Sequence, residues 1–567
     1  MDAALDQDFD VIVVGSGAGG GMTAYELCRQ GLKVLMLEAG RDYDPLTETP
    51  MFEIPGAAPL RGARTPDKPK GYYDATVDGG WEVPGEPYTN APDTDEEFMW
   101  WRPRMLGGRT NHWGRISLRF GAYDFKYKDR DGLGVNWPMT YGDLESWYDK
   151  TEELIGVTGD IAGLTNTPDS PAEILHELPP IRAHEIVLKR AYEAMGIPVI
   201  GNRVSILTRE HHGRAACFFA TPCKRGCSIR ANFQSTTVLI PPAMETGNLT
   251  IITNAMVYGV DTNESGLATG VGYVDRLTGE RKTVNAKAVA LAAGACETAR
   301  ILLNSNQGNG VANSSGLVGK YIMDTVGARA RGHIPILAGL PPRNDDGLSA
   351  AHIYVPWWGY DAQARGELDF ARGYHVEVSG GCSMPQMTVG DMAQESEVEF
   401  GAGLRGEMKR LYGSYVMMVG RGEMIPNEDC YLEIDPTVKD KWGIPVPRFN
   451  WKWGEQDIRQ AAHMTKTFRE IFDRLGGTIL QNGEVDGRDA IEQAGSIIHE
   501  VGGARMGETR ETSVTNPHGQ TWDVPNLYIM DGAVFASNPD KNPTLTILAL
   551  AMRNSAHLAT AMKTGGF

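Results

Sequence analysis

The chain has 567 residues, 41% of them hydrophobic, which is typical of a globular protein with more than one hydrophobic core. Its formal net charge of −18 argues against nucleic acid and anionic membranes as partners, because both bind through clustered Lys and Arg. Seven cysteines is an odd number, which argues against a disulfide framework. The sequence shows no apolar run of about 18 residues, so we expect no direct membrane insertion.

Residues 9–40 predict a βαβ unit, in which a β-branched run is followed by a glycine turn, a helix and a second strand. The turn contains G-x-G-x-x-G. Gly15 allows the tight turn, Gly17 lets the backbone approach a pyrophosphate, and Gly20 lets the helix pack closely. Glu38 ends the second strand, where it can accept hydrogen bonds from ribose hydroxyls. We therefore predict a dinucleotide site, and this segment alone leaves NAD and FAD as alternatives.

The segments that follow alternate between loop, helical and strand-like patterns. Residues 41–100 are rich in Pro, Gly and Asp and predict a long surface excursion. Short strand-like runs separated by Pro and Gly between 316 and 455 indicate an antiparallel sheet. Further strands are expected between 248 and 294, and helices are expected at 140–157, 183–196 and 455–475.

Four separated segments carry a family resemblance. They are GGRTNHWGR at 107–115, ALAAGACETARILLNS at 290–305, HEVGGARMG at 499–507 and NLYIMDGAVFASNPDKNPTLTILALA at 526–551. Together with the βαβ unit, they resemble the glucose–methanol–choline oxidoreductases, which are FAD-dependent enzymes. Asn542 stands where many relatives have His, as in the branch that holds pyranose oxidases, gluconate dehydrogenases and glucoside 3-dehydrogenases.

The resemblance implies an α/β fold with two parts. A Rossmann-type FAD-binding domain is expected from residues 1–125, 205–315 and 495–567, so it is discontinuous in sequence. A substrate-binding domain that contains an antiparallel sheet is expected from 126–204 and 316–494. This arrangement is similar to that of p-hydroxybenzoate hydroxylase.

The resemblance also implies roles for individual residues. Asp531 is expected near the pyrophosphate and ribityl chain of FAD, and the backbone of Val257 near the adenine. Asn542 and Thr544 are expected beside the isoalloxazine, and His499 as the active-site histidine. An imidazole suits a general base that removes the hydroxyl proton of the substrate while a hydride moves to flavin N5. The amide of Asn542 can orient that hydroxyl but cannot take its proton.

His112 follows the paired glycines Gly107 and Gly108, which can let the backbone approach the flavin ring. In pyranose oxidases and some gluconate-type dehydrogenases, a histidine at this spacing is bonded to the 8α-methyl group of the flavin. The His-Trp pair is retained here, whereas Arg109 and Asn111 differ from the family pattern. Two alternatives stay open: a covalent link through His112, or packing of its ring against the dimethylbenzene edge.

Cys217, Cys223 and Cys227 are spaced as C-x₅-C-x₃-C. Dehydrogenases of the resembling branch can carry iron–sulfur ligands in this loop, and three thiolates can suffice for a three-iron cluster. Ala220 stands where a related pattern has another cysteine. We therefore favour a loop that packs near the FAD-binding domain without a cluster, and no metal site is predicted.

Three classes of function fit these features: an FAD-dependent sugar dehydrogenase, an NAD-linked dehydrogenase and a non-catalytic flavin scaffold. We favour the FAD-dependent sugar dehydrogenase, because it gives the C-terminal motif residues a role. The resemblance implies oxidation at C3 of a pyranoside to a 3-keto sugar. A sterol or a long-chain alcohol is the alternative substrate. Trp357, Trp358, Tyr360 and His352 are candidates for a sugar platform, although a Trp-rich run is more often core packing.

The resemblance extends to partners beyond the sugar or glycoside substrate. Gluconate and glucoside dehydrogenases often work with a small subunit that carries the export signal and with a cytochrome that accepts the electrons. The first residues of this sequence, MDAALDQDFD, lack the basic and apolar regions of a signal peptide. We expect either a cytoplasmic enzyme or one that reaches the periplasm with a signal-bearing partner.

Overall fold

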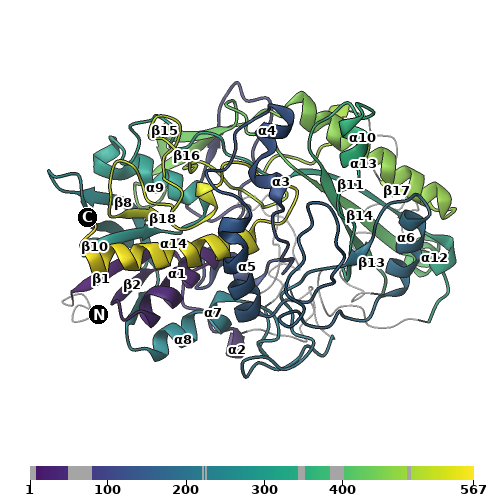
Figure 1. Ribbon diagram of the computed structural model, residues 1–567, viewed down its shortest axis with the longest axis horizontal. Coiled ribbons are helices and arrows are strands. Elements are labelled where there is room, and N and C mark those ends of the chain that lie inside the picture. Colours follow the sequence, from purple (N-terminus) through teal and green to yellow (C-terminus); the bar gives the residue numbers. More distant parts are fainter. Residues whose placement is uncertain are drawn as a thin grey trace.

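The protein is described by a computed structural model that covers residues 8–48, 79–219, 223, 226–341, 351–382, 401–481 and 487–567. Two β-sheets lie toward opposite ends of its longest axis (Figure 1). The larger sheet has seven strands and the other has four. No described helix is long and apolar enough to cross a membrane.

The seven-stranded sheet combines strands from distant parts of the chain. Its order is β7-β2-β1-β10-β9-β8, and β18 also pairs with β10. β1, β2, β7, β10 and β18 are parallel, whereas β9 pairs with β8 and β10 in antiparallel fashion. The strands are β1 (Phe9–Val14), β2 (Val34–Leu37), β7 (Leu249–Ile252), β8 (Ala255–Thr262), β9 (Ala268–Asp275), β10 (Arg281–Leu291) and β18 (Leu527–Ile529). The β-branched run in β1 is buried, as expected for a parallel sheet with helices on its faces.

Helices from the two ends of the chain pack together beside this sheet. α14 (Thr544–Thr564) packs against α1 (Ala18–Arg29) and α5 (Gly142–Ile155), and Figure 1 shows α14 running alongside α1. α9 (Ala295–Gly308) packs on β8. The C-terminal helix α14 thus lies beside α1, the helix of the N-terminal βαβ unit.

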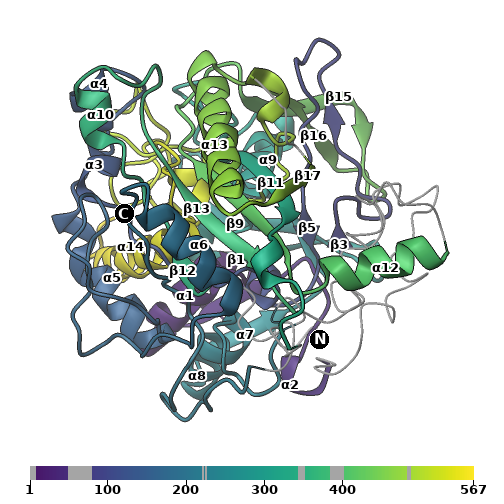
Figure 2. The same cartoon turned by 90° about the vertical axis from the view of Figure 1, so that its right-hand side faces the viewer.

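The four-stranded sheet is antiparallel and has the order β13-β14-β11-β17. Its strands are β11 (Val326–His333), β13 (Tyr374–Gly380), β14 (Tyr415–Gly422) and β17 (Thr478–Gln481). α13 (Glu455–Arg474) covers this sheet and contacts β11 and β14 (Figure 2). The predicted antiparallel sheet and the three predicted helices are confirmed, the latter as α5, α6 (Ala183–Glu193) and α13.

Smaller elements connect the two sheets. Part of the expected excursion at 41–100 lies outside the described residues, and its remainder contributes short strands. The other strands are β3 (Gly79–Gly80), β4 (Thr89–Asn90), β5 (Arg102–Pro103), β6 (Ile200–Gly201), β12 (Ile353–Tyr354), β15 (Tyr431–Lys439) and β16 (Pro445–Asn450). The other helices are α2 (Pro45–Glu48), α3 (Ala122–Phe125), α4 (Tyr127–Asp131), α7 (Ser235–Val238), α8 (Ile240–Glu245), α10 (Tyr360–Ala364), α12 (Ala402–Leu411), η4 (Gly108–Asn111), η6 (Pro335–Leu337), η7 (Gly487–Ala490) and η8 (Gly532–Val534).

The strands of the two sheets fall within the sequence ranges predicted for the two domains. One hydrophobic core cluster nevertheless contains residues of both, such as Ile12 of β1 and Val376 of β13. The exact domain boundaries therefore stay a prediction.

Candidate active site

A cavity of about 710 Å³ is lined by both sheets, which is within the usual range for a ligand site. One part of its wall is formed by the carboxyl ends of β1 and β2, the residues that follow β18, and the first residues of α1, α9 and α14. Residues of β11, β13 and β14 contribute to another part. The sequence-predicted residues in this wall are Gly15, Gly17, Glu38, Gly108, His112, Val257, His499, Asp531, Asn542 and Thr544.

The three glycines of the turn differ in the space around them. An added Cβ at Gly20 would lie 2.0 Å from the carbonyl oxygen of Gly15, and Gly15 itself has a φ of +98°. An added Cβ at Gly17 would meet nothing within 4 Å. Gly107 lies behind the wall, where its N–H donates to Ser16 Oγ at 2.8 Å. The turn thus brings the N-terminus of α1 to the cavity, where backbone N–H groups favour an anion.

Two predicted carboxylates are held by backbone and hydroxyl donors. Glu38 accepts from Ser16 Oγ at 2.5 Å and from Gly40 N at 2.7 Å. Asp531 accepts from Gly294 N at 2.9 Å and Thr298 Oγ1 at 2.6 Å, and burial raises its pKa. These bonds fix Glu38 at the end of β2 and fix Asp531 against the start of α9.

His499 and Asn542 lie together in the cavity wall, as the sequence motifs predict. Thr325 Oγ1 is 2.9 Å from His499 Nδ1, and Asn542 Nδ2 is 3.5 Å from His499 Nε2. The same Asn542 nitrogen donates to Glu377 Oε1 at 3.1 Å. Because a carboxylate can only accept, the NH₂ of Asn542 must face Glu377, and the second N–H points at His499. His499 Nε2 then carries the lone pair and Nδ1 the proton.

The amide orientation leaves Asn542 Oδ1 buried without a hydrogen-bond partner among the described residues. Burial and the charge of Arg421 lower the pKa of His499 to about 3, although Glu377 opposes them. The imidazole is therefore neutral near pH 7 and able to accept a proton.

The backbone around His499 is constrained. His499 N donates to Asp324 Oδ1 at 2.9 Å, and burial together with Glu500 raises the pKa of Asp324 to about 7. Ile498 has a φ of +66°, which is unfavourable for a β-branched residue. Strain of this kind is concentrated at functional sites, where surrounding contacts enforce it.

Sequence reasoning missed Glu377 and Arg421, which lie on β13 and β14 and line the cavity. Arg421 Nε is 3.7 Å from Glu377 Oε2, and no hydrogen bond to a described residue satisfies this Nε. Burial works against the charge of Glu377, but Arg421, His375 and Asn542 hold its pKa below the ordinary value. A charged residue inside an otherwise apolar strand is the signal that could have drawn attention to both.

His112 lines the cavity, and its Nε2 accepts from Trp101 Nε1 at 3.0 Å. Burial, Arg115 and Arg109 lower the pKa of His112 to about 3, so its ring is neutral. The cysteines predicted as possible cluster ligands line a separate cavity of about 10 Å³. Within the described part of the chain, the three thiols do not form a group whose ligand atoms all lie within 4.8 Å of one another.

The aromatic residues expected as a sugar platform do not line the cavity, so that interpretation was wrong. Trp357 is 4% exposed and packs against Phe370 and Tyr374, because β12 and β13 bring these rings into the core. His352 and Tyr360 instead bond to Pro180 O and Asn166, and Trp358 packs against Tyr374. The tryptophans in the cavity wall are Trp81, Trp100, Trp101 and Trp113.

Comparison with known proteins supports the family resemblance seen in the sequence motifs, and the matches extend along most of the chain. The N-terminal profile of the GMC oxidoreductases matches residues 9–327 and the C-terminal profile matches 426–551. A 2-methyl-1,2-propanediol dehydrogenase of Mycolicibacterium austroafricanum is 30% identical over 99% of this chain and 96% of its own length. The fructose dehydrogenase large subunit of Gluconobacter japonicus is 27% identical over 98% of each chain.

A solved structure of formate oxidase from Aspergillus oryzae covers 99% of both chains with a TM-score of 0.64 and 14% identity, which supports the fold. The profile matches, the glycine turn and the cavity at the C-terminal motif agree with one another. The chain belongs to the glucose–methanol–choline family of FAD-dependent oxidoreductases.

Proposed function

We propose that the protein oxidises a secondary hydroxyl of a sugar or glycoside, with C3 of a pyranoside as the reacting carbon. The observation that carries the proposal is the neutral His499 beside Asn542 in the cavity wall. One relative is named for a sugar, fructose, and another for a small diol. The choice of C3 rests on the resemblance to glucoside 3-dehydrogenases.

The cavity residues fit FAD. Gly17 faces open space at the N-terminus of α1, where the pyrophosphate would bind. The buried Asn542 Oδ1, which has no partner among the described residues, can accept a hydrogen bond from a group bound beside His499. Glu38 would bind the ribose hydroxyls. Asp531 would lie near the pyrophosphate and ribityl chain, and the backbone of Val257 near the adenine. Bound FAD supplies the hydride acceptor.

The residues of this chain account for binding and proton transfer. His499 Nε2 takes the proton of the substrate hydroxyl, and the Asn542 N–H beside Nε2 turns to donate to the oxygen of that hydroxyl, which orients it. The N-terminus of α14 favours the negative charge that develops nearby. Glu377 and Arg421 offer an acceptor and several donors for neighbouring hydroxyls of the same substrate.

We propose His112 as the residue that contacts the dimethylbenzene edge of the flavin. Acid precipitation of the loaded protein decides between the two alternatives for this contact. Flavin that stays with the polypeptide indicates a covalent link through His112, whereas complete release of flavin leaves packing as the role.

We propose a signal-bearing small subunit and a cytochrome as partners, in keeping with the relative named as a large subunit. Fractionation of native cells tests this. Activity confined to the cytosol with no co-purifying small subunit would rule it out.

The function is tested by incubating flavin-loaded protein with sugars, glycosides, sterols and long-chain alcohols, using a dye acceptor and oxygen in parallel. Turnover and flavin bleaching with a pyranoside, and a 3-keto product by NMR, are the expected results. Bleaching only by a sterol or long-chain alcohol would move the assignment to the alternative substrate. Dependence of turnover on added NAD would overturn the flavin mechanism.

A further inference from the structure

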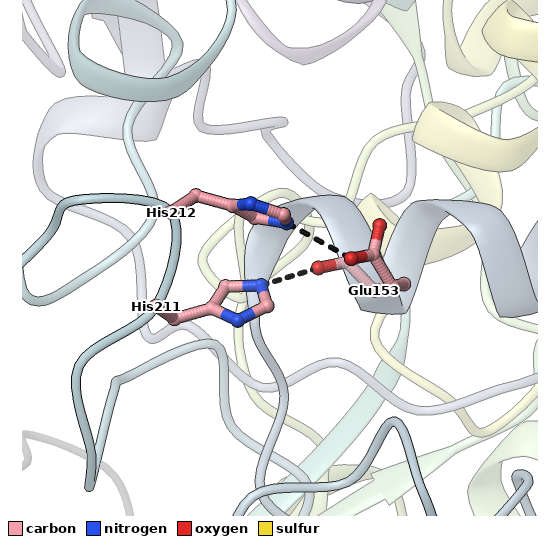
Figure 3. Close-up of side chains that lie close together, drawn as sticks. All are labelled: Glu153, His211 and His212. Carbon is pink, nitrogen blue, oxygen red and sulfur yellow. Dashed lines mark hydrogen bonds and ion pairs between the residues drawn. The ribbon is translucent and has the colours of Figure 1, made fainter.

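A cluster of two histidines and a carboxylate lies outside the active-site cavity. It comprises Glu153, near the end of α5, and His211 and His212 in a turn of the segment that follows β6. Each residue offers one ligand atom, and these atoms all lie within 4.8 Å of one another. Figure 3 shows both imidazole rings pointing from their turn toward Glu153.

The contacts within the cluster are short. His212 Nε2 is 2.9 Å from Glu153 Oε1, and His211 Nε2 is 2.5 Å from the backbone oxygen of Glu153 (Figure 3). Ligand atoms on a tetrahedral zinc ion are about 3.4 Å apart, given bonds of about 2.1 Å. The three atoms therefore need only small side-chain rotations to close on one ion. The side chains of His212 and Glu153 are 53% and 49% exposed, so both an ion and these rotations have room.

The backbone holds the histidines in this position. His212 and Gly213 have φ values of +49° and +71°, and His211 is bridged to Arg214 across the turn. Two successive residues with positive φ make a tight hairpin turn. Arg214 donates to the carbonyl oxygens of Leu154 and Ile155, so the turn is fixed to the end of α5.

A third imidazole, that of His176, lies next to the cluster. His176 is 1% exposed, and neither of its ring nitrogens has a hydrogen-bond partner among the described residues. Its ring meets that of His211 edge to face, with centroids 4.8 Å apart. Gly156 makes room for both rings, since a Cβ there would lie 3.4 Å from His176 Nε2 and 3.2 Å from His211 Cδ2. A buried imidazole without a partner is unusual, and the His176 ring supports His211 from behind without belonging to the group of three ligand atoms.

We propose that Glu153, His211 and His212 form a binding site for a borderline divalent transition-metal ion of the zinc type, with solvent completing its coordination. Imidazole nitrogen with one carboxylate oxygen is a donor set that suits zinc, copper or nickel rather than magnesium or calcium. On binding, the proton of His211 Nε2 moves to Nδ1 so that Nε2 can coordinate the ion. The ion links the turn to α5.

Capping of α5 is the simpler role for part of this cluster. Without an ion, His211 Nε2 caps the carbonyl oxygen of Glu153, whereas Arg214 caps that of Ile155 in either state. That role requires neither the His212 ring nor the Glu153 carboxylate. Variants of these two side chains therefore separate a metal site from a helix cap.

The test is calorimetric titration of untagged, flavin-loaded, chelator-treated protein with ZnCl₂. We expect one tight site per chain, and we expect His212→Ala and Glu153→Gln each to weaken zinc binding by at least about tenfold. Glu145→Gln is the matched control, because Glu145 is an exposed carboxylate on the same helix. MgCl₂ and CaCl₂ should bind at least about a hundredfold more weakly than zinc.

A second measurement reports on the folded protein. An ion that binds only the native state raises the Tm by mass action, so zinc should raise the Tm of the wild type and of Glu145→Gln but not of the other two variants. Absence of zinc binding to the wild type overturns the proposal. Zinc that binds His212→Ala and Glu153→Gln with wild-type affinity is held elsewhere, for example by Cys223 and Cys227, and also overturns it.

Discussion

His499 is the residue on which proton transfer depends in the proposed reaction. We expect His499→Ala to retain flavin and to lose about 10²–10⁴ in kcat, because removal of a general base typically has this effect. Stopped-flow measurement of flavin reduction checks this directly. His557→Ala is a suitable control, since that ring stacks on His518 outside the cavity. Flavin reduction at the wild-type rate in His499→Ala would remove the histidine from the mechanism.

The pH dependence of kcat/KM follows from the same ring. Only neutral His499 can accept a proton, and burial with Arg421 lowers its pKa from 6.5 to about 3. Activity should therefore persist as the pH falls through 6.5, where an ordinary histidine becomes protonated. A loss of activity near pH 7 that disappears in Asp324→Asn belongs instead to Asp324, whose pKa burial and Glu500 raise to about 7. A loss centred on 6.5 that survives in Asp324→Asn would show that the His499 ring is solvated.

Glu377 is expected to act as a positioning residue, since its carboxylate fixes the amide of Asn542. Glu377→Gln removes the negative charge of this acceptor. The same negative charge raises the pKa of His499, so that pKa should fall in the variant. We expect kcat to fall about 10–150-fold, equivalent to ~1.5–3 kcal/mol for a hydrogen bond to a charged group. The acid limb of the pH profile should also move to lower pH. Glu433→Gln, which breaks a strand ion pair with Arg448 outside the cavity, is the control and should change neither quantity.

The sequence predicted part of this site and missed the rest for a physical reason. His499 and Asn542 stand in contiguous motifs whose resemblance to a family is visible in the chain itself. Glu377 and Arg421 face each other only because β13 pairs with β14 in one register, in which Glu377 lies opposite Val419. Such pairing brings together residues separated by dozens of positions, and a one-residue shift would turn them to the other face.

At the scale of secondary-structure elements, the glycine turn before α1 offers a matched pair of substitutions. Gly17 has extended backbone angles and open space at its Cβ position, so Gly17→Ala should fold normally. It should weaken FAD binding by at least about tenfold, or ~1.4 kcal/mol, because the methyl group would occupy the position that we propose for the pyrophosphate. Gly20→Ala should instead destabilise the fold by about 1–3 kcal/mol, since its methyl group meets Gly15 O. Thermal unfolding of apoprotein measures the effect on stability, and fluorescence titration with FAD measures the effect on binding. Equal FAD affinity in Gly17→Ala and the wild type would contradict the prediction for Gly17.

Helices and parallel strands were predictable because their periodicity is local. α5, α6 and α13 appear where apolar spacing placed them, and the βαβ unit appears at residues 9–40. The run around Trp357 was a candidate for a sugar platform, with core packing as the more frequent role, because composition does not tell which face of an element is buried. Contacts with Phe370 and Tyr374, which lie further along the chain, decide that.

At the scale of the whole molecule, the cavity is lined by both sheets, so we expect FAD bound in it to contact both. FAD should therefore stabilise the entire chain against unfolding, by about 2.7 kcal/mol at a free concentration of 100 times its Kd. Differential scanning calorimetry of loaded protein and apoprotein measures this. His499→Ala should show the same increase in Tm, because it leaves the dinucleotide contacts intact. Separate transitions of the two sheets, with only one shifted by FAD, would contradict a common unfolding unit.

The order of strands in the seven-stranded sheet has a consequence for synthesis of the protein. β10 pairs with β1 from the first residues and with β18 from residues 527–529. During synthesis on the ribosome, β10 cannot pair with β18 until residues 527–529 have emerged, and the cavity lacks Asn542 until residue 542 has emerged. We therefore expect FAD to bind late in synthesis, after these residues have been made. Shorter nascent chains expose the edge of β10 that later pairs with β18, and chaperones can recognise such an edge.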